Sequence, residues 1–201
     1  MERSARHAWL GPGVCPRITL RGARIFFPTT DAHDMTSPKN IYRRFIALEE
    51  QAAQIYLNMA SRFASENPEL SALWLDMGIQ EKEHAGLLQF CLCEEMFASA
   101  LPTAEEARKL HGHFAALEER AADPALTVLD AFKIAIDMEV CEVNTIYSQL
   151  TTPLHRSMYL LRRKILTSMP THIERLLSAG RQFGIPATML KKLERVVQKT
   201  A

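Results

Sequence analysis

From residue 37 onward, apolar residues recur every three or four positions, the spacing that places them on one face of an α-helix. No segment alternates apolar and polar residues as a half-buried strand does. The pattern predicts four long helices, over about residues 37–65, 67–98, 126–150 and 153–183, with shorter helices over about 103–123 and 186–199. The sequence therefore predicts an all-α four-helix bundle. The helix over 103–123 forms the crossover between the second and third long helices, and a short helix ends the chain.

Capping residues support the starts of three of these helices. Ser37 and Asn67 each precede a proline, which combines a side-chain cap with a residue suited to the first helical turn. Thr103 is followed by Glu105 and Glu106, the pattern of a capped helix start with acids in its first turn. The short connections within the first and last pairs of long helices make each pair antiparallel neighbours.

Residues 1–36 have a different character from the rest of the chain. They contain several glycines and prolines and show no sustained helical period. We expect a disordered or extended tail over 1–36 and a bundle domain over 37–201. Two alternatives are open: the five arginines before Asp31 are compatible with a targeting segment, and Met35 is a plausible true start just before the first helix.

Composition narrows the function classes. The chain has 201 residues, 47% of them hydrophobic, which is enough for one sizeable core. A formal net charge of +1 gives no electrostatic reason to expect nucleic acid or an anionic membrane as a partner. The four cysteines form no Cys-x-x-Cys pair, and no apolar run reaches the roughly 20 residues that span a bilayer. We expect a cytoplasmic protein without a membrane or nucleic-acid partner.

Ionisable residues interrupt the apolar faces of the four long helices near their middles. They are Glu49, Glu81, His84, Glu139, Glu142 and His172. Burying a single carboxylate costs several kcal/mol, so acids on such faces need a partner. Two divalent cations would neutralise four glutamates without any lysine or arginine. The pattern predicts a two-metal site with these six residues as ligands and no separate catalytic residue.

The spacing of these residues sharpens the prediction. Glu81 and His84 are three positions apart on the second helix, and Glu139 and Glu142 repeat this spacing on the third. A Glu-x-x-His motif joined by glutamates from other helices is the ligand set of carboxylate-bridged metal sites in bundles. Oxygen and imidazole ligands without thiolate favour two iron ions, with manganese as the alternative.

Three segments of the chain resemble the rubrerythrin branch of the ferritin-like superfamily: LEEQAAQIY (48–56), QEKEHAGLL (80–88) and DMEVCEVNTIY (137–147). The resemblance covers roughly residues 40–180. It implies a ferritin-like bundle whose two irons react with peroxide or dioxygen. In the main hypothesis Glu49, Glu81 and His84 serve one metal, and Glu139, Glu142 and His172 serve the other, with the bridging roles left open.

The sequence departs from that family on the fourth helix. The family's second Glu-x-x-His has Met169 in place of its glutamate, and Pro170 follows inside the predicted helix. The chain also lacks a rubredoxin-like Cys-x-x-Cys module, so an electron donor would be a separate protein. We expect a homodimer or higher homo-oligomer. The main hypothesis is a peroxidase or ferroxidase-type oxidoreductase. Its rivals are a degenerate bundle that works as a binding module with one metal or none, and an iron-storage protein.

Overall fold

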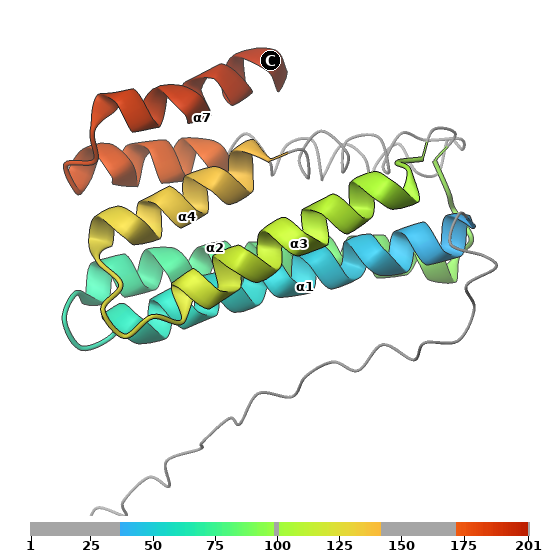
Figure 1. Cartoon of the computed structure of the whole chain (residues 1–201), viewed down its shortest axis with the longest axis horizontal. Coiled ribbons are helices and arrows are strands. Elements are labelled where there is room, and N and C mark those ends of the chain that lie inside the picture. The colour runs from blue at the N-terminus through green and yellow to red at the C-terminus, as the bar shows by residue number, and fades with distance from the viewer. Residues whose placement is uncertain (1–36, 99–100, 142–171, 201) are drawn as a thin grey trace, which may run out of the picture. The chain divides into compact units, whose positions relative to one another are not determined.

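The computed structural model describes residues 37–98, 101–141 and 172–200, all within the unit His33–Ala201. These residues form α1 (Pro38–Phe63), α2 (Pro68–Cys93), α3 (Ala104–Ala121), α4 (Val128–Val140), a helical segment over 172–182, and α7 (Ala187–Thr200) (Figure 1). No strand occurs in these ranges, so the predicted all-α class is confirmed there. None of the described helices is long and apolar enough to cross a membrane. The predicted tail over 1–36 lies outside the described residues.

The first two helices form a closely packed antiparallel pair (Figure 1). Asn67 caps α2 by accepting a hydrogen bond from the Leu70 amide at 3.0 Å, with Pro68 at the first helical position. Gly78 permits the close approach, because a Cβ there would lie only 3.2 Å from the carbonyl oxygen of Ala53. The Ser71 hydroxyl adds a direct bond between the helices, donating to a main-chain carbonyl of α1 at 2.7 Å. The pairing matches the sequence prediction.

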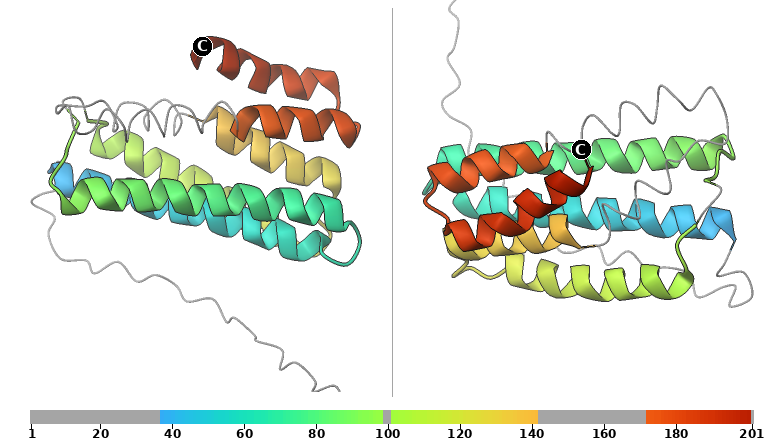
Figure 2. Two further views of the ribbon diagram at one scale, coloured as in Figure 1. Left: turned by 180° about the vertical axis from the view of Figure 1, so that it is seen from behind. Right: turned by 90° about the horizontal axis from the view of Figure 1, so that it is seen from above.

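The other described helices add further layers to this pair, with α7 outermost (Figure 2). Helix α3 contacts α1 and α4, while α4 also contacts α1 and α7. The segment 172–182 is tied to α2 by an ion pair of 3.2 Å between Arg175 and Asp76, and by a hydrogen bond of 2.5 Å from Gln182 to Glu69. Gly184, with φ +70°, ends that segment in the left-handed region and lets the chain turn into α7. Large aromatic side chains fill the core: Trp74, Tyr42, Tyr56, Phe45, Phe114 and Phe132.

Two helices end earlier than the periodicity predicts. Helix α2 stops at Cys93 rather than near residue 98, because Glu95 adopts a φ of 54° and the chain turns away. Helix α4 stops at Val140, where the prediction continued to about residue 150. Cys141 has extended backbone, with ψ 161°, and its thiol donates to the Met138 carbonyl at 2.7 Å. A side-chain donor at that carbonyl competes with the next helical turn.

Candidate metal centre

Five of the six predicted ligands are described, and all five are buried. The exposed fractions are 3% for Glu49, 6% for Glu81, 6% for His84, 5% for Glu139 and 3% for His172. They come from four elements: α1, α2, α4 and the segment 172–182. Glu142, the sixth, lies outside the described residues. Buried acids are rare unless they are paired, so their shared burial marks a built site.

Helix registration explains why these side chains point inward. Glu49 lies on the same face of α1 as the buried Phe45, Ala52 and Tyr56. Its neighbour Glu50 is only half-buried and pairs with Lys82 on α2. The choice of Glu49 over Glu50 as the inward acid is therefore confirmed.

The same logic applies to the segment 172–182. His172 is buried together with Ile173, Leu176 and Leu177, whereas Glu174 is exposed. Glu174 therefore does not join the cluster from its described position, as its offset of two residues from His172 predicts.

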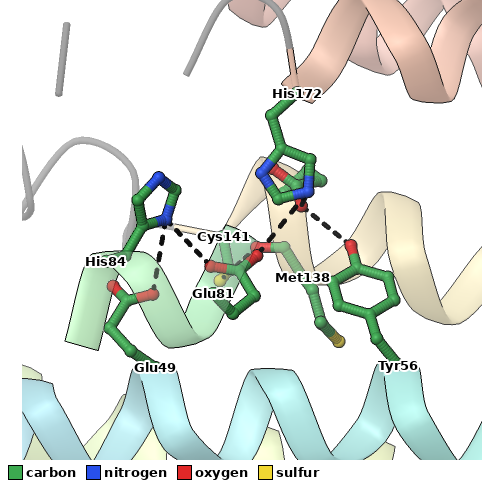
Figure 3. A network of polar contacts seen from close by, with 8 residues as sticks. Glu49, Tyr56, Glu81, His84, Met138, Cys141 and His172 are labelled. Carbon is green, nitrogen blue, oxygen red and sulfur yellow. Dashed lines mark hydrogen bonds and ion pairs between the residues drawn. The ribbon is translucent and has the colours of Figure 1, made fainter. Parts of the chain in front are cut away.

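Glu81 lies at the centre of the cluster, between the two imidazoles (Figure 3). Its Oε2 is 3.0 Å from Nδ1 of His84, and its Oε1 is 3.7 Å from Nε2 of His172. Glu49 approaches from α1, with its Oε2 at 3.9 Å from the same Nδ1 of His84. The structure thus gathers side chains from α1, α2 and the segment 172–182 around Glu81 and His84.

Glu139 approaches the cluster from α4. Its Oε1 lies 3.5 Å from Nε2 of His172 and accepts a hydrogen bond from the Tyr56 hydroxyl at 2.8 Å. Tyr56 in turn stacks on Trp74, with ring centroids 5.9 Å apart. The sequence assigned Tyr56 no role. Tyr56 follows Glu49 by seven residues, which is two helical turns along the same face. This spacing could have indicated that Tyr56 lies next to the cluster.

Burial of the cluster disfavours the ionised forms of its carboxyl and imidazole groups. Burial first, and then the nearby charge of Glu139, raises the pKa of the Glu81 carboxyl to about 8. Burial first, and then the nearby charge of Glu81, raises the pKa of Glu49 well above its usual range. Burial also lowers the pKa of His172, which favours its neutral, ligand-competent form. Without a cation, protons must neutralise these acids.

A small cavity adjoins the carboxylates. Its volume is about 10 Å³, room for about one water molecule or ion. The lining consists of Glu49, Glu81 and Glu139 with the apolar residues Leu48, Ala52, Phe114 and Met138. The cluster therefore has space for one water molecule or ion, and apolar side chains surround that space. Phe114, from α3, is a lining residue that the search for ligand types in the sequence did not identify.

The residues present fit a metal ion. Glu81, His84 and His172 each offer a ligand atom, and these atoms lie within 4.8 Å of one another. Nε2 of His172 is buried and finds no hydrogen-bond partner among the described residues. A cation would satisfy this orphaned nitrogen and offset the negative charge in one step. The carboxylate and imidazole donors suit iron or manganese.

Comparisons with known proteins agree with this chemistry. Residues 41–168, well over half of the chain, match the family model for rubrerythrin. Comparison with curated proteins and with solved structures finds no significant match to the chain. The family match covers Glu49, Glu81, His84 and Glu139, which the structure independently gathers into one buried cluster. This chain therefore belongs to the rubrerythrin family.

Proposed function

We propose that this chain is a di-iron redox protein that reduces peroxide or dioxygen. The observation that carries the proposal is the buried cluster of three carboxylates and two imidazoles. Such a cluster is stable when cations occupy it. Membership of the rubrerythrin family supports iron as the metal.

The ligands in this proposal are Glu49, Glu81, His84, Glu139 and His172, with Glu142 as the sixth from sequence. Two bound Fe(II) ions would supply the electrons for reducing the oxidant. The chain's own residues bind and orient the ions. The apolar wall from α1, α3 and α4 limits water at the site, which strengthens the electrostatic interactions inside it.

Tyr56 contributes by holding one ligand in place. Its hydroxyl donates to Oε1 of Glu139 at 2.8 Å, which fixes the orientation of that carboxylate. Glu49 lines the cavity beside the cluster, together with Glu81 and Glu139.

The same proposal extends to architecture and partners. Helix α3 serves as the crossover between the two halves of a ferritin-like four-helix bundle, a role supported by its packing against both α1 and α4. In this proposal a separate donor protein supplies the electrons. The chain acts as a homodimer or larger homo-oligomer.

Metal analysis tests the proposal directly. The full chain, produced with ample iron, is expected to hold two irons and to show a near-ultraviolet charge-transfer band that bleaches on reduction. The reduced protein is expected to consume hydrogen peroxide. Glu81→Gln should lose both properties, while Glu174→Gln, an exposed acid on the segment 172–182, should keep both. Less than one metal per chain in the parent protein would contradict the proposal.

One observation favours the rival function, a binding module with a degenerate site. Met169 stands where the family's fourth-helix motif has a glutamate that commonly bridges the metals. It lies outside the described residues. Restoring the acid in Met169→Glu separates the two functions: a parent that loads poorly and a variant that loads two irons would favour the degenerate module. Two irons per chain in both proteins would favour the redox protein.

A further inference from the structure

An exposed stripe runs along α2, on the face opposite its buried residues. Three large apolar side chains lie on this stripe with about half of their surface exposed: Leu75 at 46%, Ile79 at 49% and Phe90 at 50%. Single exposed apolar residues are common on protein surfaces. These three differ because they share one face of one helix. The exposed members of the stripe are Ala72, Leu75, Ile79, Lys82, Glu83, Gly86, Phe90 and Cys93.

The spacing of the stripe is that of a seam between two helices. At about 100° per residue, its members fall within a sector of about 100° around the helix axis. From residue 72 to residue 86 the exposed positions advance alternately by three and four residues, as the contact positions of a coiled coil do. The stripe from Ala72 to Cys93 extends along about 31 Å of helix. A second helix lying along α2 would contact all of it.

The stripe is also complementary to itself. Its centre lies between Lys82 and Glu83. If two copies of α2 pack antiparallel about a two-fold axis at this point, each residue faces the one that lies equally far on the other side of the centre. The resulting pairs are Ala72 with Cys93, Leu75 with Phe90, Ile79 with Gly86, and Lys82 with Glu83.

We propose that this stripe is the interface of a homodimer, in which α2 of one copy packs antiparallel against α2 of a second copy. A two-fold contact uses the same surface on both copies, so that surface must complement itself, and the four pairs meet this condition. The inference assigns an interface to the homodimer proposed for this chain. It goes beyond the redox function, because it requires neither a metal nor an oxidant.

Side-chain size and charge both favour the antiparallel register. A Cβ at Gly86 would meet no atom within 4 Å in the part of the chain that the structure describes, so the branched side chain of Ile79 from the other copy has room there. At the centre, Lys82 of each copy faces Glu83 of the other, which gives two pairs of opposite charge. A parallel arrangement would place like charges together at these positions. Contact between Leu75 and Phe90 removes apolar surface from water at both ends of the stripe.

The centre of this interface lies on the turn of α2 that carries two of the proposed ligands. Glu81 and His84 are buried on the inner side of that turn, whereas Lys82 and Glu83 are exposed on its outer side. Lys82 also pairs with Glu50 on α1, beside the stripe. The second copy therefore packs against the outer side of the ligand-bearing turn.

Sedimentation analysis of the full chain measures the assembly directly, and we expect a dimer at micromolar concentration. Ile79→Asp places a carboxylate in the interface and should raise the dimer dissociation constant by at least ~30-fold. Leu129→Asp is the matched control, the same change at a side chain that is 38% exposed on α4, and should leave the dimer intact. Far-UV circular dichroism checks the fold, and Leu75→Glu replaces Ile79→Asp if helicity falls.

Disulfide cross-linking tests the register. Ala72→Cys should give a disulfide-linked dimer under mild oxidation, because position 72 of one copy faces Cys93 of the other. Adding Cys93→Ser should abolish this product. The parent chain should not be linked through Cys93, because the antiparallel register separates the two copies of this residue by about 31 Å along the helix axis.

The outcomes separate this inference from the proposed function. A chain that sediments as a monomer would overturn the interface, and so would a dimer that Ile79→Asp leaves intact. A parent dimer that is linked through Cys93, and is no longer linked in Cys93→Ser, would show a parallel pairing and overturn the antiparallel one. A monomer that holds two irons and reduces peroxide would refute the interface alone, whereas a dimer that binds no iron would refute the redox function alone.

Discussion

The stability of the metal-free protein should fall as the pH rises from about 6.5 to 8, the reverse of the usual trend for paired carboxyl groups. The folded chain raises the pKa of Glu81 from 4.5 to about 8, so between these values the folded state binds a proton that the unfolded state has released. A group of this kind stabilises the fold at low pH, and its contribution is lost as the pH rises. Glu49, with its raised pKa, acts in the same direction.

The magnitude follows from the shift. The full change in pKa corresponds to roughly 5 kcal/mol, of which about 2 kcal/mol falls between pH 6.5 and 8. Below pH 6.5 His172 opposes the effect: its lowered pKa means that the unfolded chain takes up the extra proton as the pH falls. The interval from pH 6.5 to 8 is therefore where the acid effect is clearest.

Urea denaturation of the metal-stripped chain, in the presence of a chelator, measures this dependence. Glu81→Gln carries a neutral amide in place of the acid, so its slope with pH should be shallower and its stability at pH 8 higher than that of the parent. Glu119→Gln, an exposed acid on α3, should keep the parent's slope. Saturating metal should reverse the trend, because ligands must lose protons to bind it. A metal-free parent whose free energy of unfolding is flat or rises over this interval would refute the reasoning.

Three further predictions concern stability at a fixed pH. Tyr56→Phe removes the donor to the buried carboxylate of Glu139 and should lower the free energy of unfolding by about 1–3 kcal/mol; a loss under about 0.5 kcal/mol would contradict this. Gly78→Ala places a methyl group 3.2 Å from a carbonyl of α1 and should cost about 1–3 kcal/mol, whereas Gly86→Ala on the open face of α2 should gain up to about 1 kcal/mol. Thr103→Ala removes the hydroxyl that accepts from the Glu106 amide, although the backbone bond from residue 103 to the Glu106 carboxylate remains, and should cost about 1 kcal/mol by thermal denaturation; an unchanged melting temperature would count against the cap.

The local signals in the sequence predicted most of the described helices. The caps at Ser37, Asn67 and Thr103 act through side-chain oxygens on amides three residues ahead, as their spacing requires. Such signals depend only on neighbouring residues, so they survive without tertiary information. The ends of α2 and α4 were predicted too far along the chain. At those points a positive φ at Glu95 and the thiol of Cys141 interrupt a pattern that remains helical in its apolar spacing.

The burial of the candidate ligands was also predictable, because a charged residue within an apolar stripe must follow the stripe inward. Their mutual arrangement was not. The sequence divided Glu49, Glu81 and His84 from the acids and histidine of the later helices. In the structure Glu81 lies within 4 Å of both His84 and His172. That arrangement depends on the axial offset between neighbouring helices. The spacing of residues within one helix carries no information about this offset.

What the sequence determined by itself is the set of helices, the face each one buries, and the kinds of side chain that those faces carry toward a common interior. Helical periodicity and capping are short-range properties, so one chain segment contains all of their causes. Tertiary structure alone decided that Glu81 stands between two imidazoles, that Tyr56 holds Glu139, and that three carboxylates line one small cavity. These contacts join residues up to 91 positions apart, His172 and Glu81 among them. They arise from close packing between helices, such as that at Gly78, and burial of the groups together is what shifts their pKa values.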